Sequence, residues 1–242
     1  MHKKKIKVNP VDQVLQVLIY LIIIALCLII LLPCLNVVAL AFNDGADAAR
    51  GGVWFWPREF TLDNFKEVFK DGSITSAYVV TIARTVIGTF LSLMVTTMAG
   101  FALKQEDLPG RKIITMLITF TMLFGGGMIP TYLVIKQLGL IDTRAVMILP
   151  GAITVWNMIM CRTYFMSSIP EELYESASLD GASDIRILVS MVVPLSVPIL
   201  AVMVLFYAVG HWNSYFDAMI YLNSPELYNI QLVLRNAINN VK

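Results

Sequence analysis

Charged residues are scarce in this chain, and their scarcity excludes an ordinary soluble protein. Only 14% of the 242 residues are Asp, Glu, Lys or Arg, against about 25% in a typical soluble domain. Apolar residues make up 57% of the chain, and the mean hydropathy is +0.73. The sequence therefore predicts a membrane protein embedded in a lipid bilayer. A net charge of +1 gives no bulk attraction to nucleic acid, so no nucleic-acid partner is expected.

Residue patterns for metal binding and catalysis are also missing. The three cysteines, at positions 27, 34 and 161, lie in or beside apolar runs at no metal-ligand spacing, and we interpret them as small core hydrophobes. His2 and His211 are too far apart to suggest a metal pair. No G-x-x-x-x-G-K-[ST], H-E-x-x-H or G-x-S-x-G motif occurs. We expect no catalytic residue, no metal and no cofactor in this chain.

Five apolar segments are long enough to be membrane-spanning helices. The Lys-rich start, M-H-K-K-K-I-K, predicts a cytoplasmic N-terminus, and Lys104, Arg111 and Lys112 predict a cytoplasmic loop at 104–112. The loop at 168–186 is then cytoplasmic as well, whereas 43–74 and 136–144 are outside. The expected spans are 14–42, 76–103, 113–135, 145–164 and 187–209.

The expected spans contain no Asp or Glu that could relay protons or sodium ions, which weighs against an ion-coupled transporter. Other polar or irregular features do occur there. Gly125, Gly126 and Gly127 interrupt the third span, either for tight helix packing or to open backbone to a translocation path. Asn157 lies mid-span and should face protein or water. Arg84 lies about two turns into the second span, where it can snorkel outward or form a structural ion pair.

A polar island of about thirty residues, 168–198, interrupts this apolar chain. Ser168 and Glu171 are spaced as a capping box, which predicts a short helix running to about Leu179. Gly181 tolerates the backbone angles of a sharp bend, and a second helix follows that becomes apolar from Ile187. A helix, a glycine bend and a helix entering the membrane form a shape suited to docking a partner. The alternative is an ordinary surface loop between two spans.

Part of the island matches a known motif. The matching residues are Glu175, Ser176, Ala177, Asp180, Gly181 and Ala182, with Pro194 nineteen positions after the glutamate. They resemble the EAA loop of ABC importer permeases, in which alanine is commoner at the position of Ser176. In that family this loop is a cytoplasmic coupling helix that sits in a cleft of the ATP-hydrolysing subunit.

The resemblance covers nearly the whole chain. Three segments are similar to the carbohydrate-uptake branch of type I ABC importer permeases, above all to oligosaccharide or lipo-oligosaccharide permeases of Gram-positive bacteria. They are F-T-x-x-F-x-G-G-x-I-P-x-Y, L-G-L-I-D-T and F-Y-A-V-x-x-W-N-x-Y-F-x-A-x-I-Y-L. The resemblance implies an all-α polytopic membrane helix bundle. Residues 1–74 would form an N-terminal span and outer segment, and 75–242 the transmembrane core. Because the family has a sixth span after the last outer segment, we expect about five spans and a core incomplete at its C-terminus.

The resemblance also implies a function and a set of partners. The chain would be a permease subunit that moves a sugar or oligosaccharide across the cytoplasmic membrane, and not itself an enzyme. Its partners would be cytoplasmic ATP-binding subunits, a second homologous permease and an extracellular substrate-binding protein. Two alternatives remain: the same architecture for a peptide or other solute, and a membrane scaffold that transports nothing.

Overall fold

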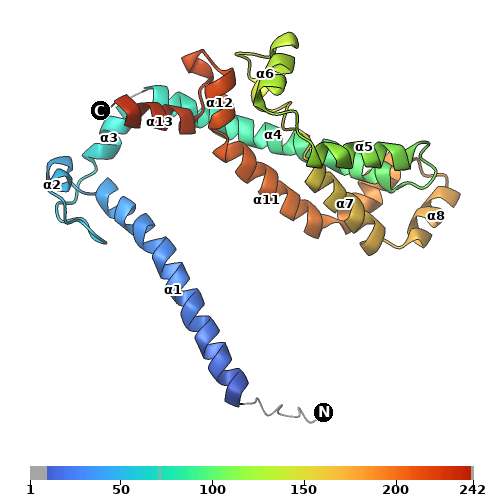
Figure 1. Cartoon of the computed structure of the whole chain (residues 1–242), viewed down its shortest axis with the longest axis horizontal. Helices are drawn as coiled ribbons and strands as arrows, with labels where there is room; N and C mark the ends of the chain where they lie inside the picture. The colour runs from blue at the N-terminus through green and yellow to red at the C-terminus, as the bar shows by residue number, and fades with distance from the viewer. Residues whose placement is uncertain (1–9, 71, 241–242) are drawn as a thin grey trace. The chain divides into compact units, whose positions relative to one another are not determined.

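The first apolar segment forms one long helix, followed by a small folded segment (Figure 1). The computed structural model describes residues 10–70 and 72–240, and it divides into two compact units, Met1–Asp71 and Gly72–Lys242. Each unit is described by itself. In the first, α1 (Pro10–Ala41) exposes its apolar side chains from Val11 to Val38, as expected of a helix surrounded by lipid, and only its last turn is covered.

Asn43 organises the rest of the first unit, which contains α2 (Gly45–Ala49) and α3 (Asp63–Lys70). Its side chain is fully buried and accepts hydrogen bonds from the backbone N–H groups of Arg58 and Glu59, at 2.7 and 3.0 Å. Its amide nitrogen donates to Asp47, which also pairs with Arg58. These bonds close the 43–60 segment into a loop, because one buried amide satisfies backbone groups from both of its ends.

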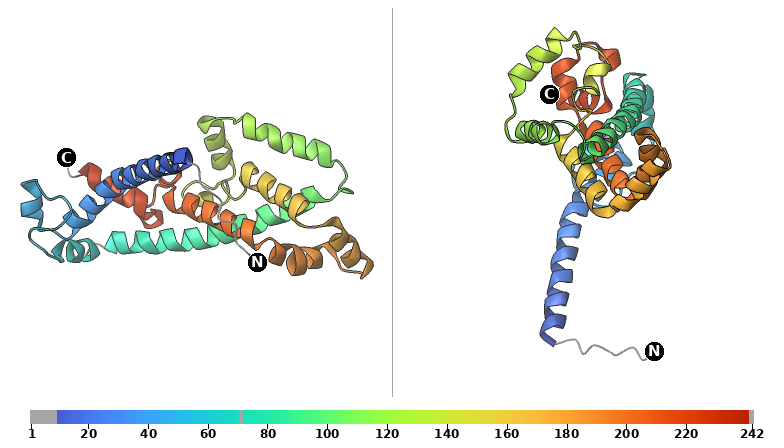
Figure 2. Two further views of the ribbon diagram at one scale, coloured as in Figure 1. Left: turned by 90° about the horizontal axis from the view of Figure 1, so that it is seen from below. Right: turned by 90° about the vertical axis from the view of Figure 1, so that its right-hand side faces the viewer.

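The second unit is built along α4 (Gly72–Lys104), a 33-residue helix. Two helices pack against it, α7 (Val155–Ser168) and α11 (Val197–Asn213) (Figure 2). Small residues allow this close approach. A Cβ atom added at Gly88 would lie 2.7 Å from the ring of His211 on α11, and one added at Gly100 would lie 3.1 Å from Cys161 on α7.

Two of the expected spans are sharply bent helix pairs. The third consists of α5 (Arg111–Leu123) and α6 (Met128–Gln137), and the chain bends by 119° between them, at the three glycines. The fifth begins with α9 (Asp184–Ile187), a π-helical turn η2 (Leu188–Val192) and α10 (Val193–Leu195), and it bends by 87° into α11. If each bent pair is counted as one span, the described part of the chain has at most four segments able to cross a membrane: α1, α4 and the two pairs.

The expected fourth span, 145–164, is wrong as a single helix. The segment starts with one 3-10 turn, η1 (Ala145–Met147), and continues as irregular backbone to Thr154. Pro150 lacks the N–H group that a helix interior needs, and Gly151 follows it directly. Regular helix therefore resumes only at α7, which has 14 residues and runs past the predicted end.

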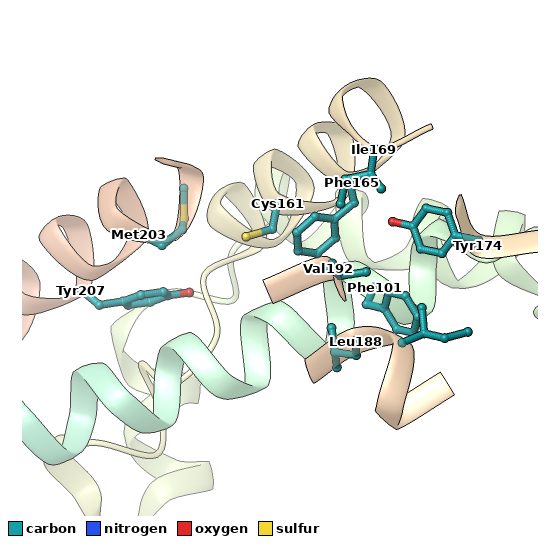
Figure 3. Packing of buried hydrophobic residues seen from close by; sticks show 10 residues of the cluster. Phe101, Cys161, Phe165, Ile169, Tyr174, Leu188, Val192, Met203 and Tyr207 are labelled. Carbon is teal, nitrogen blue, oxygen red and sulfur yellow. The ribbon is translucent and has the colours of Figure 1, made fainter. Parts of the chain in front are cut away.

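The second unit contains two large apolar clusters and a small one of Ile74, Ala77 and Ile230. One large cluster contains Phe101, Phe165, Tyr174 and Tyr207 and lies where α4, α7, α8 (Glu171–Leu179) and the fifth segment meet (Figure 3). The other large cluster lies among α6, η1 and α12 (Phe216–Tyr221). The chain continues through η3 (Pro225–Leu227) to α13 (Ile230–Asn240), which packs against the start of α4.

Candidate functional site

The short helix expected in the polar island is α8, and its start differs from the prediction. Ser168 is the last residue of α7, and Pro170 occupies the cap position of α8 without a side-chain cap hydrogen bond. The expected capping box is therefore wrong. Ile169 is buried in the apolar cluster and turns the chain in an extended conformation, so α8 begins at Glu171. That carboxylate is used instead in an ion pair with Lys104.

The end of α8 forms as predicted, around Gly181. This glycine has φ +76°, and its N–H donates to the carbonyl of Ser178 at 3.0 Å. The next N–H, of Ala182, donates to the carbonyl of Ala177, also at 3.0 Å. These two bonds form a Schellman motif, in which a left-handed glycine lets the helix satisfy its own last carbonyls. The D-G-A triplet therefore closes α8 and directs the chain back toward the membrane helices.

The six residues of the predicted coupling site divide into two groups. Ala177 and Ala182 are half-buried and pack against the apolar cluster. Their small size lets α8 lie close to that cluster. The outward group is exposed and consists of Glu175, Ser176, Asp180 and Gly181. Leu179 and Ile185 are also exposed, at 88% and 74%, so the outer surface of the bend combines polar groups with bare apolar side chains.

Lys104 is a residue of this site whose role sequence reasoning missed. Its side chain is 4% exposed, and its Nζ lies 2.6 Å from Oε2 of Glu171 and 3.2 Å from the ring centroid of Tyr174. Burial and the negative charge of Glu171 raise the pKa of Tyr174 to about 12. The sequence does carry a signal for this role: Lys104 lies at the end of a long apolar helix, where a buried cation needs a partner.

A second candidate site is a hollow of about 350 Å³ between α7, α11 and the irregular segment before α7. Asn157 is buried and lines it, as the sequence predicted for a residue facing protein or water. The hollow is also lined by the polar residues Arg84, Thr131, Thr154, Tyr207, His211, Ser214 and Asp217.

Hydrogen bonds fix several of these groups in place. The hydroxyl of Tyr207 lies 2.5 Å from that of Thr96 on α4, and it accepts a hydrogen bond from the N–H of Thr154. Arg84 does not snorkel. It is buried and donates to the carbonyls of Met147 and Ser214, at 3.2 and 3.3 Å. The cation thereby satisfies the carbonyl of Met147 in the broken backbone, while the carbonyl of Ser214 also accepts a hydrogen bond from the side-chain amide of Asn229, at 2.7 Å.

The three glycines lie apart from this hollow. Gly125, Gly126 and Gly127 are exposed and connect α5 to α6. Gly127 has φ +86°, which accounts for a glycine at this position, and a Cβ added at Gly125 or Gly127 would meet nothing within 4 Å. The tight-packing interpretation of these two glycines is therefore wrong within this chain. Among the residues the structure describes, no group of His, Cys, Asp or Glu side chains is arranged to hold a metal ion.

No family model matches the chain, but individual known proteins do, and they show its family. The polygalacturonan/rhamnogalacturonan transport system permease protein YtcP of Bacillus subtilis (strain 168) is 38% identical over 227 residues, which are 94% of this chain and 79% of the relative. Protein LplC of the same organism is 42% identical over 207 residues, 86% of this chain and 70% of the relative. The arabinooligosaccharides transport system permease protein AraQ of Halalkalibacterium halodurans is 27% identical over 207 residues, 84% of this chain and 74% of the relative.

A solved structure agrees with these relatives. The crystal structure of a bacterial ABC transporter involved in the import of the acidic polysaccharide alginate contains a chain 30% identical to this one. The TM-score is 0.92, and the match covers 98% of this chain and 85% of that chain. The expected all-α permease fold is thereby confirmed. The chain belongs to the family of ABC importer permease subunits that contains these sugar-transport proteins.

Proposed function

We propose that the chain is the membrane permease subunit of an ATP-driven importer that carries a sugar or oligosaccharide across the cytoplasmic membrane. The substrate class is supported by the relatives, which are named for polygalacturonan, rhamnogalacturonan and arabinooligosaccharides, and by the alginate importer. The observation that carries the proposal is α8, a short exposed helix held at both ends by contacts to the helices behind it.

The outer surface of α8 docks the cytoplasmic ATP-binding subunit. Glu175, Ser176, Asp180 and Gly181 are presented outward, whereas Ala177 and Ala182 fix the helix to the cluster. Leu179 and Ile185 add the apolar area that a protein interface needs at its centre. ATP hydrolysis takes place on that partner, and this chain contributes no catalytic residue. A second permease and an extracellular substrate-binding protein complete the importer.

The chain enters the membrane with its N-terminus in the cytoplasm. The loops 104–112 and 168–186 share that side, a proposal supported by the ion pair that brings Lys104 to Glu171. The loop 136–144 lies outside. It is tied to the chain before η3, because Asp142 accepts hydrogen bonds from the N–H groups of Asn223 and Ser224.

Transport is favoured over a purely structural membrane scaffold by the polar hollow. A scaffold needs no polar groups between its membrane helices, yet Thr154, Asn157 and Tyr207 line a hollow there. Hydroxyl and amide groups of this kind can replace the water around a sugar. The hollow is consequently the proposed segment of the translocation path in this chain. Gly125, Gly126 and Gly127 lie apart from the hollow, and their proposed contribution is the bend between α5 and α6, which opens backbone groups to the translocation path.

The test uses the complete importer, with its partner permease, ATPase subunits and binding protein, in sealed vesicles. Uptake of labelled oligogalacturonate, arabinooligosaccharide and a control dipeptide is measured with ATP and a proton ionophore present. We expect uptake of one of the sugars, unchanged by the ionophore and absent without ATP. Uptake driven by an imposed ion gradient without ATP would contradict the proposal, and uptake of the dipeptide alone would contradict the substrate class.

A further inference from the structure

One ammonium group joins the end of α4 to the first turn of α8. Lys104 is the last residue of α4, and both groups around its Nζ, the carboxylate of Glu171 and the ring of Tyr174, belong to α8. Lysine is almost never buried unless it is paired, and this side chain is 4% exposed. The cation also lies at the C-terminal end of its own helix, where the helix dipole favours positive charge.

Tyr174 supplies the part of this contact that is shielded from water. Glu171 is 57% exposed, so water competes for its carboxylate, whereas Tyr174 is 5% exposed. Its ring also stacks on Phe101 of α4, with the centroids 6.3 Å apart. The tyrosine hydroxyl is buried and has no hydrogen-bond partner among the residues that the structure describes. The ring, and not the hydroxyl, is therefore the feature of this residue that the arrangement uses.

The other attachment of α8 is of a different kind. Ala177 and Ala182 touch the apolar cluster through single methyl groups, which give weak and non-directional attraction. A buried cation held against a carboxylate and an aromatic face also resists separation, because charges attract strongly where water is excluded. Lys104 is thus the charged contact between α4 and α8, and it lies beside the stacking of Phe101 on Tyr174.

Movement of α4 reaches the hollow directly. The helix is continuous from Lys104 back to the residues that face the hollow. Its Ser92 hydroxyl lies 3.4 Å from Nε2 of His211, and Thr96 contacts Tyr207. Both of these partners line the hollow from α11. A displacement of the Lys104 end along the axis of α4 would therefore shift these contacts.

We propose that Lys104 is a positioning residue that transmits the movement of α8 to α4, and through α4 to the hollow. The proposal rests on the proposed function, in which α8 docks the ATPase subunit. Glu171 and the ring of Tyr174 hold the ammonium group on the α8 side. Without that group, α8 keeps its Schellman motif and its alanine contacts, so docking persists while transmission is lost.

The test compares Lys104→Met with Lys112→Met in the complete importer in vesicles. Methionine keeps most of the side-chain length and removes the charge, and Lys112 is an exposed lysine of the same loop without an ion pair to any described residue. We expect Lys104→Met to retain the ATPase subunit and its ATP hydrolysis, while substrate taken up per ATP falls about tenfold, a typical size for coupling between sites. Lys112→Met should match the wild type.

Tyr174 variants separate this role from general packing. Tyr174→Phe keeps the ring and should leave uptake per ATP unchanged, whereas Tyr174→Leu should lower it as Lys104→Met does. In the Lys104→Met/Tyr174→Leu double variant, uptake per ATP should fall no further than in either single variant, since both substitutions remove the same contact.

Uptake per ATP within about twofold of the wild type in Lys104→Met would overturn the proposal. Loss of the ATPase subunit in proportion to the loss of uptake would overturn it too, because Lys104 would then serve only to fold the site. A failure of the proposed function is distinguishable from both. It would appear in the wild-type complex, as an ATPase subunit that does not associate or uptake that needs no ATP.

Discussion

At the scale of single residues, Gly181 carries the most specific chemistry of the candidate site. Its φ of +76° is costly for other residues, by about 1–3 kcal/mol, and its backbone is exposed at the tip of the bend. A Cβ atom placed there would meet nothing within 4 Å in this chain. Substitution therefore acts through backbone strain and through the docked partner, not through a clash within the subunit.

Gly181→Val is expected to leave membrane insertion near normal and to remove the ATPase subunit from the purified complex. Gly181→Asn is the matched control, because asparagine tolerates left-handed backbone and should retain more of the partner. Glu175→Lys should weaken docking through charge, most strongly at low salt, where screening is least. Co-purification of the ATPase subunit measures all three. Normal association of Gly181→Val would show that the bend is only a connector.

Gly88 allows α4 and α11 to approach each other. A Cβ atom there would lie 2.7–2.9 Å from three ring atoms of His211, which itself is buried. Gly88→Ala should therefore lower the free energy of unfolding by about 1–3 kcal/mol, as overpacking of a core does. Gly210→Ala on α11 is the control, since its Cβ would meet nothing within 4 Å. Thermal unfolding in detergent compares the two, and equal midpoints would contradict the predicted clash.

At the scale of elements, the loop after α6 is fastened by one carboxylate. Asp142 has φ +58° and accepts hydrogen bonds from the N–H groups of Asn223 and Ser224 and, at 2.5 Å, from the hydroxyl of Ser224. These bonds, with the Ser224 hydroxyl first, lower the pKa of Asp142. The L-G-L-I-D-T segment is thereby joined to the chain before η3.

This fastening predicts a pH dependence of stability. Because the folded pKa lies below the unfolded value of about 3.9, the stabilisation is complete above that pH and is lost as the pH falls through the folded pKa. Asp142→Asn keeps the shape and tolerates the backbone angle, so it should be less stable at pH 7, with a deficit that narrows below about pH 4. Asp107→Asn, at an exposed loop carboxylate, should show no deficit. A deficit for Asp142→Asn that stays constant down to pH 3 would contradict this account.

Local chemistry decides which elements the sequence could predict. The end of α8 was predictable because a glycine after a short helix sets its own backbone angle. The start of α8 was not, because Ser168 continues α7 instead of capping the next helix. The fourth span failed because hydropathy counts apolar residues across Pro150 without registering the break in backbone hydrogen bonding. Lys104 was missed because Glu171 lies 67 residues away along the chain.

At the scale of the whole molecule, the resemblance to permeases gave the fold, and the relatives confirm it. The orientation in the membrane stays a prediction. A single cysteine introduced at Ala49 or at Asp107, both exposed, tests it in a chain from which Cys27, Cys34 and Cys161 have been removed. An impermeant thiol reagent added to sealed cells should modify position 49 and spare position 107. The reverse pattern would invert the proposed arrangement.

The Schellman motif also bears on how the importer assembles. The bend after α8 is ordered by hydrogen bonds within its own chain, so the proposed docking surface exists before any partner arrives. Binding then avoids the cost of ordering this backbone, about 1–2 kcal/mol for each residue that would otherwise have to be fixed. Association between two preformed surfaces proceeds at roughly 10⁵–10⁷ M⁻¹s⁻¹ without a refolding step. The pace of assembly would accordingly follow the concentrations of the subunits in the cell.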